Sequence, residues 1–163
     1  MPLTLIDSKP YRFDSANKAS TPSPATRLAF AMICLFTPEN RIVTGGGDTV
    51  ANLRENFSKG KYCESDGRNH PIPFAVRGAF RQVTTTRGEM GPVQGTVFGF
   101  VVPKWMEGIS GPGVRCCFLS GCHRKGGEVV DFESVSGTFI EWAVSDNCHI
   151  GFPRDEKFET MEL

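Results

Sequence analysis

Beyond Asn40, short apolar segments alternate with glycine-containing turns. The segments are Phe74–Val76, Ala79–Thr85, Thr96–Val102, Val114–Leu119, Glu128–Glu133, Thr138–Val144 and His149–Phe152. Segments of this length between turn-forming residues are typical of strands in a sheet that can close into a barrel. The pattern therefore predicts an α+β domain built on a mixed or antiparallel, barrel-like β-sheet.

One buried helix is predicted in the first half of the chain. Ser23 is a suitable N-cap and Pro24 suits the first helical position. The helix would continue through Leu28, Met32 and Leu35 and end before Pro38. Because this segment is apolar on nearly all sides, it is expected to pack against the sheet.

Residues 1–22 are polar and contain serine, threonine, proline and asparagine. A segment of this composition is expected to form a loosely held, flexible N-terminal arm. Residues 23–163 would then form a single domain, which is long enough to bury a core.

Composition excludes several classes of partner. The 163 residues contain 18 basic and 18 acidic side chains, so neither nucleic acid nor an anionic membrane is an expected partner. The longest apolar run, Leu28–Phe36, is too short to span a bilayer. The six cysteines form no evenly spaced framework, which favours mostly reduced thiols in a cytoplasmic protein.

The segment from Gly95 to Glu133 contains the most informative side chains. In a strand over Val114–Leu119, Arg115 and Cys117 would point to the same face. Gly126 and Gly127 then open a returning strand in which the next residue is Glu128. The sequence predicts that a cation, a thiol and a carboxylate meet at one place.

Three blocks in this part of the chain resemble the alpha-acetolactate decarboxylases. They read GTVFGF at 95–100, PGVRCCF at 112–118 and GGEVVDF at 126–132. The corresponding family blocks read GT-x-x-GF, PGYHLHF and GGHVLDF. Weaker likeness extends the resemblance to roughly residues 50–158, through FAVR at 74–77, TR at 86–87 and HIGFP at 149–153. The chain is shorter than a typical member of the family.

The resemblance implies a changed metal site. The family binds zinc through three histidines, and the matching positions here are Arg115, Cys117 and Glu128. A guanidinium has no lone pair to donate to a metal, although a cysteine and a glutamate could still hold zinc with other ligands. We expect no metal and no cofactor, with the charge of Arg115 in place of the cation and Glu128 paired to it. The alternative is a structural ion pair inside a barrel.

The resemblance also implies further site residues. Arg115 would stabilise an oxyanion, while Glu128 would orient it or carry a proton. Glu55 aligns near the family's metal-proximal glutamate and is a candidate base, and Arg87 is a candidate anchor for a substrate carboxylate. Cys117 and Trp105 are candidate substrate-binding residues. For each of these, a solvated surface position or ordinary core packing is the alternative.

Together these features predict a metal-independent enzyme of small-molecule, specialised metabolism. It would be an isomerase, cyclase or lyase acting on an oxygenated, carbonyl-bearing substrate in an acetolactate-decarboxylase-like pocket. One alternative is a zinc-dependent lyase with altered ligands, and another is a non-catalytic ligand-binding module. The expected partner is a small molecule, and a homodimer is allowed for.

Overall fold

The computed structural model describes residues 3–26, 31–34, 36–62, 69–110 and 113–151. The first half contains β1 (Thr4–Ile6), β2 (Lys9–Phe13), β3 (Ala19–Ser20), β4 (Ala31–Cys34), β5 (Asn40–Val43) and α1 (Val50–Ser58). The second half contains β6 (Ile72–Thr85), β7 (Gly88–Met90), β8 (Val93–Val102), a 3₁₀ turn η2 (Lys104–Met106), α2 (Glu107–Ser110), β9 (Gly113–Ser120), β10 (Gly126–Ser134), β11 (Phe139–Trp142) and β12 (Cys148–Gly151).

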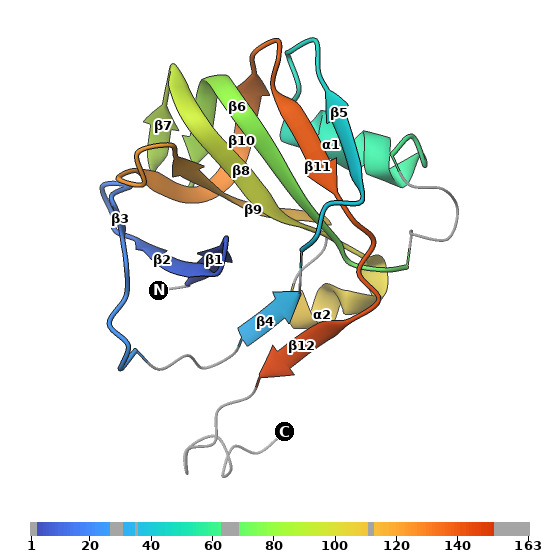
Figure 1. The fold of residues 1–163 in the computed structure, drawn as a ribbon, viewed down its shortest axis with the longest axis horizontal. Helices are drawn as coiled ribbons and strands as arrows, with labels where there is room; N and C mark the ends of the chain where they lie inside the picture. Colours follow the sequence, from blue (N-terminus) through green and yellow to red (C-terminus); the bar gives the residue numbers. More distant parts are fainter. Residues whose placement is uncertain (1–2, 27–30, 35, 63–68, 111–112, 152–163) are drawn as a thin grey trace.

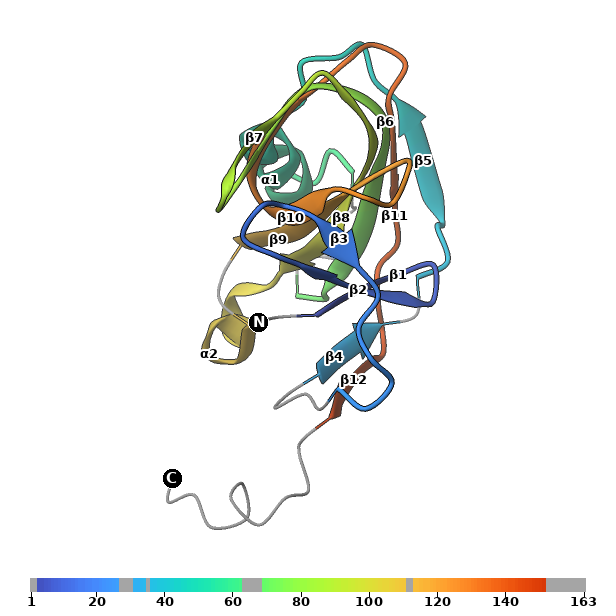
Figure 2. The same ribbon diagram turned by 90° about the vertical axis from the view of Figure 1, so that its left-hand side faces the viewer.

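Four of these strands close into a small barrel (Figures 1 and 2). They pair in the order β10–β9–β8–β6, and β10 pairs again with β6 to complete the ring. β11 and β5 extend the sheet beyond β6, and every pairing among the described strands of this sheet is antiparallel. The predicted antiparallel, barrel-like sheet is therefore confirmed.

The barrel interior is filled by every second side chain of its strands. Val76 from β6, Val97 from β8 and Phe118 from β9 are each fully buried there. Phe80 packs edge-on against both Phe118 and Phe132, with ring centroids 5.7 and 5.6 Å apart. Complete burial of these rings makes the barrel a packed core rather than a binding cavity.

The buried helix of the structure is α1, which lies elsewhere than predicted. It begins at an N-cap formed by Thr49 in a capping box with Asn52, and it buries Leu53 and Phe57 in the barrel core. The segment predicted as a helix contains β4 instead, antiparallel to β12. A short apolar run fits a strand or a buried helix equally well, and here backbone pairing with β12 selects the strand. Leu28 and Leu35 lie outside the described residues.

The predicted loose arm is instead an ordered sheet. Strands β1, β2 and β3 form a separate three-stranded sheet, on the left below the barrel in Figure 1. Tyr11, Phe13 and Ala19 are buried against Ala75, Phe98 and Leu119 on the outer face of the barrel. The expectation of looseness was wrong because three side chains at alternate or paired positions suffice to bury one face of this small sheet, despite its polar composition.

The described thiols match the sequence analysis in part. Cys116, Cys117 and Cys122 are free, as predicted. Cys148 is disulfide-bonded, which was not predicted. Disulfides are most common in oxidising environments, so the cytoplasmic location stays a prediction. Among the helices of the described ranges, none is long and apolar enough to cross a membrane.

Candidate active site

A cavity of about 520 Å³ lies between the N-terminal sheet and the outer face of the barrel. The barrel contributes outward-facing residues of β6, β8, β9 and β10, which form its floor. Residues 3–8, Phe13, Ile33 and Phe36 form the opposite wall. Cavities of this size that are mostly apolar and contain a few polar groups are typical of small-molecule sites.

Strand register brings Arg115, Cys117 and Glu128 together at the floor. Cys117 of β9 is directly opposite Glu128 of β10, and all three residues line the cavity. The Arg115 Nη1 atom lies 3.5 Å from Glu128 Oε1, and its Nε donates to the Ser110 carbonyl oxygen at 3.0 Å. The structure thus places the cation, the thiol and the carboxylate at one hollow.

The Arg115–Glu128 pair is not a structural pair inside the barrel. Both side chains are on the outer face, where they are 54% and 47% exposed. An exposed pair with one long contact contributes only about 0–1 kcal/mol to stability. The fold therefore does not depend on this pair, and both charges face a ligand-sized space.

Arg87 lines the cavity next to these residues. It follows β6 in the tight turn to β7, and the Thr86 amide donates to the Glu128 carbonyl oxygen at 3.0 Å, which holds this turn beside β10. Within the described part of the chain, no carboxylate lies within 4.0 Å of the Arg87 guanidinium. Its charge is thus available to an anionic group of a ligand.

Glu55 and Trp105 lie away from the cavity. Glu55 is on α1, where Lys59 hydrogen-bonds its half-exposed carboxylate and lowers its pKa. It lines a separate shallow hollow with Arg54 and Asp131. The indole of Trp105 is mostly exposed, and its Nε1 donates to the Asn69 carbonyl oxygen at 2.9 Å. The structure does not bring these two candidates to the other four.

The Cys117 thiol is unsuited to nucleophilic attack at neutral pH. Burial raises its pKa to about 11, with the nearby Glu128 carboxylate adding to the shift. Burial raises the pKa of Cys116 as well. Because the thiolate is the nucleophile, Cys117 can contact a ligand at pH 7 only as a protonated thiol on the cavity floor.

These pKa shifts predict the order in which the thiols react with iodoacetamide. The exposed Cys122 has a pKa lowered by a hydrogen bond from Ser120, so it should be alkylated first at pH 8. Only about one in a thousand Cys117 thiols is ionised at pH 8, so it should react far more slowly, and faster only as the pH approaches 11. Peptide mass spectrometry over time measures the order, and rapid labelling of Cys117 at pH 8 would contradict it.

The donor set at the floor does not fit zinc. A guanidinium cannot coordinate, and the Cys117 pKa of about 11 opposes the thiolate that a metal requires. The Glu128 carboxylate already lies beside the Arg115 cation. In the described ranges, no group of three His, Cys, Asp or Glu side chains is arranged to hold a metal ion.

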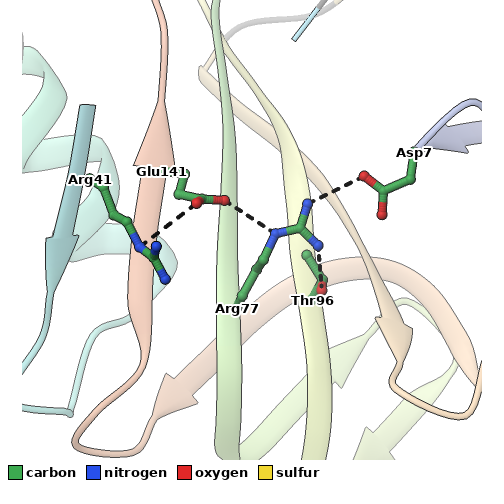
Figure 3. Close-up of polar contacts among 5 residues, drawn as sticks. All are labelled: Asp7, Arg41, Arg77, Thr96 and Glu141. Atoms are coloured by element: carbon green, nitrogen blue, oxygen red, sulfur yellow. Dashed lines mark hydrogen bonds and ion pairs between the residues drawn. The ribbon is translucent and has the colours of Figure 1, made fainter. Parts of the chain in front are cut away.

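Arg77 is a cavity residue that the sequence analysis did not identify as part of the site. It lines the cavity from β6, and its Nε contacts the Glu141 Oε2 atom at 3.2 Å (Figure 3). The available signal was alternation along β6, since Val76 points inward and Arg77 must therefore point outward. The FAVR motif alone did not show which face carries the cavity.

Comparison with known proteins finds similarity to the alpha-acetolactate decarboxylases. The family model for alpha-acetolactate decarboxylase matches residues 86–163. The alpha-acetolactate decarboxylase of Brevibacillus brevis is 21% identical over 97% of this chain, and that of Methylococcus capsulatus is 23% identical over 94%. The chain spans 61% and 65% of the length of these two relatives.

Solved structures agree on the fold. The alpha-acetolactate decarboxylase of Bacillus subtilis strain 168 superposes with a TM-score of 0.83 at 19% identity, covering 98% of this chain and 75% of that one. A Staphylococcus aureus protein of unknown function, similar to alpha-acetolactate decarboxylase, gives a TM-score of 0.76 at 16% identity, covering 88% and 68%. The chain is therefore similar to the alpha-acetolactate decarboxylases in sequence, over residues 86–163 by the family model, and shares their fold over most of its length.

Proposed function

We propose that this cavity is the active site of a metal-independent enzyme acting on a small carbonyl-bearing substrate. The observation that carries the proposal is the Arg115–Glu128 pair, which faces a largely apolar cavity beside Arg87, a guanidinium with no described carboxylate within 4.0 Å. The reaction class is isomerisation, cyclisation or lyase chemistry in specialised metabolism. A homodimer remains part of the proposal, and sedimentation velocity would test it.

Arg87 is proposed to bind a carboxylate of the substrate. Its guanidinium has no described carboxylate within ion-pair distance, so a ligand would not have to displace one. A guanidinium can bind a carboxylate through two parallel hydrogen bonds, which fixes orientation as well as position. Arg87 would thereby place the substrate carbonyl over the floor of the cavity.

Arg115 is proposed to stabilise the negative charge that develops on the carbonyl oxygen. Ser110 holds its Nε, and Glu128 contacts its Nη1. No contact of its Nη2 with another described residue is present, so this atom is free to donate to a substrate oxygen. A donor held in place before the reaction stabilises an oxyanion most effectively once the substrate has expelled water.

Glu128 is proposed to move a proton beside this oxyanion. Its carboxylate would remove a proton from the carbon next to the carbonyl, and the bonding electrons would form an enolate whose oxygen faces Arg115. Returning the same proton to another atom of the enolate completes an isomerisation. In a substrate with a carboxylate on that carbon, loss of carbon dioxide would form the enolate, and a proton from solvent would quench it.

The two alternatives receive less support. A zinc-dependent lyase with altered ligands requires donors that the Arg115, Cys117 and Glu128 set does not supply. A non-catalytic binding module would use the same cavity but would not need an arginine whose Nε is oriented by the Ser110 carbonyl oxygen at 3.0 Å. Glu55 and Trp105 are not part of the proposed site, because neither lines the cavity.

Sensitivity to a chelator separates these functions. The purified chain is incubated with 2-hydroxy-3-oxo acids, the substrate class that the names of the relatives indicate, and products are followed by proton NMR. We expect turnover that is unchanged by EDTA. Loss of turnover with EDTA and recovery with zinc would establish the altered-ligand lyase, whereas binding without any product would establish the binding module.

A further inference from the structure

Arg77 and Arg115 lie at opposite corners of the cavity floor. Arg77 of β6 pairs with Thr96 of β8, which pairs with Leu119 of β9, four residues along that strand from Arg115. With strands about 4.8 Å apart and a rise of about 3.4 Å per residue, the two backbones are separated by roughly 17 Å. The cavity therefore has a second cation far from the proposed reaction centre.

The space between these two corners is apolar. Ala75 and Phe98 lie in one row across the floor, and Pro73 and Phe100 lie in the next. The opposite wall presents Leu5 and Ile33, which are 48% and 46% exposed although both line the cavity. Apolar side chains left open around a hollow mark a site for an apolar part of a ligand.

The orientation of Arg77 is set by a part-buried contact with Glu141, while its outer atoms are loosely held (Figure 3). Its Nε lies 3.2 Å from the Glu141 carboxylate, which is only 15% exposed and is also 3.8 Å from Arg41 Nε. The Nη1 and Nη2 atoms reach Thr96 and Asp7 only at 3.4 Å. Such long contacts to a terminal guanidinium nitrogen are weak and leave it open to exchange.

The charges around Arg77 allow one anion to be exchanged for another. The cluster in Figure 3 contains Arg41 and Arg77 against Glu141 and Asp7, so it is neutral overall. Asp7 is the outermost member, with a side chain that is 69% exposed on the turn between β1 and β2. If a ligand anion replaces Asp7 at Arg77, the neutrality of the cluster is kept.

We propose that Arg77 forms a second anion subsite, so that the cavity selects an elongated substrate. Such a substrate has an apolar body with an anionic oxygen group at each end, one bound by Arg87 and Arg115 and the other by Arg77. In the free protein, the Asp7 carboxylate occupies the position at Arg77 that the second anionic group of the substrate would take. This inference rests on the proposed function only in taking Arg87 and Arg115 as the first anchor.

Calorimetric titration with simple carboxylates tests the second subsite. The probes are octanoate and the dicarboxylates succinate, adipate, suberate and sebacate, titrated into the whole chain. Suberate or sebacate should bind about tenfold more tightly than octanoate, because one further charge-assisted contact forms. Arg77→Met should remove this preference and leave octanoate binding unchanged. Arg87→Met should weaken the binding of octanoate and of the dicarboxylates alike.

Two further variants sharpen the test. Asp7→Asn should raise affinity for the long dicarboxylates severalfold without affecting octanoate, since it removes the competing carboxylate. Arg81→Met is the matched control, because Arg81 pairs with Glu133 at 3.2 Å and does not line the cavity. This control variant should change neither the affinity for octanoate nor the affinity for the dicarboxylates.

The outcomes separate the second subsite from the proposed function. If the wild-type chain binds octanoate through Arg87 but shows no preference for any dicarboxylate, the second subsite is overturned and the first anchor stands. A preference that survives Arg77→Met would also overturn it. If none of the probes binds, both the second subsite and the anchoring role of Arg87 are overturned.

Discussion

Replacing Arg115 with methionine should lower kcat by about 100- to 1000-fold while changing KM little. Methionine keeps much of the length and apolar stem of the side chain but removes the donors that Ser110 and Glu128 hold toward the cavity. Stabilisation of an oxyanion is a transition-state interaction, so its loss lowers kcat rather than substrate affinity. Steady-state kinetics on the substrate found by the NMR screen measures both constants.

The control for this prediction is the same substitution, arginine to methionine, at another position on the barrel. Arg81→Met removes a guanidinium that is paired with Glu133 on a strand, but that pair is outside the cavity. It should leave kcat within twofold of the wild-type value, a margin that a mere change of surface charge would not exceed. An Arg115→Met variant that retained more than a tenth of the turnover would remove Arg115 from the proposed mechanism.

Replacing Phe80 with alanine should lower the free energy of unfolding by about 3–5 kcal/mol. Phe80 is 1% exposed in the barrel interior, and it forms edge-to-face contacts with both Phe118 and Phe132. The substitution leaves a cavity among strands β6, β9 and β10, whose closed pairing limits how far they can collapse into it. Urea denaturation followed by tryptophan fluorescence measures the change.

Two further variants serve as comparisons for the size of this loss of stability. Phe80→Leu fills most of the space and should cost much less than Phe80→Ala. Leu5→Ala removes an apolar side chain that is 48% exposed, so it should cost under about 1 kcal/mol. If Phe80→Ala cost no more than Leu5→Ala, the barrel interior would not be the main source of stability.

The barrel could be predicted from the sequence because each of its strands has a local pattern of alternating side chains next to a glycine. Segments 96–102, 114–119 and 128–133 each alternate between inward and outward side chains and follow a glycine, and each lies within an observed strand. Two predicted segments, 74–76 and 79–85, are instead parts of the single strand β6. Gly78 lies between them with φ +149°, and a Cβ there would be 2.7 Å from Thr138 Oγ1. The glycine is therefore needed for close approach inside a continuous strand, not for a turn.

The N-terminal sheet and β4 could not be predicted because their partners are distant in sequence. Ala19 donates its amide to the Arg124 carbonyl oxygen at 2.9 Å, more than one hundred residues away. Ala31–Cys34 becomes a strand only because β12 pairs with it. Neither partner leaves a signal in the local composition, so a polar arm and an apolar helix were the reasonable expectations.

Only those site residues whose positions in the strands followed from the motifs could be predicted from the sequence. Alternation placed Arg115 and Cys117 on one face, and the pairing of β9 with β10 adds Glu128 opposite Cys117. Glu55 was chosen from an approximate alignment, which does not determine which side of α1 faces the cavity. Arg77 was missed for the converse reason, since its role depends on Asp7 and Glu141 from distant segments.

The cavity combines a rigid floor with a wall from a separate, small sheet. The floor belongs to the closed barrel, whereas residues 3–8 of the wall belong to a hairpin whose two-residue turn, Asp7 and Ser8, has φ of 48° and 61°. Sequence changes in this hairpin can alter the shape and charge of the cavity without disturbing barrel packing. Selectivity among substrates is thus separable from fold stability, and libraries randomised at Leu5 and Asp7 offer a direct route to new specificities.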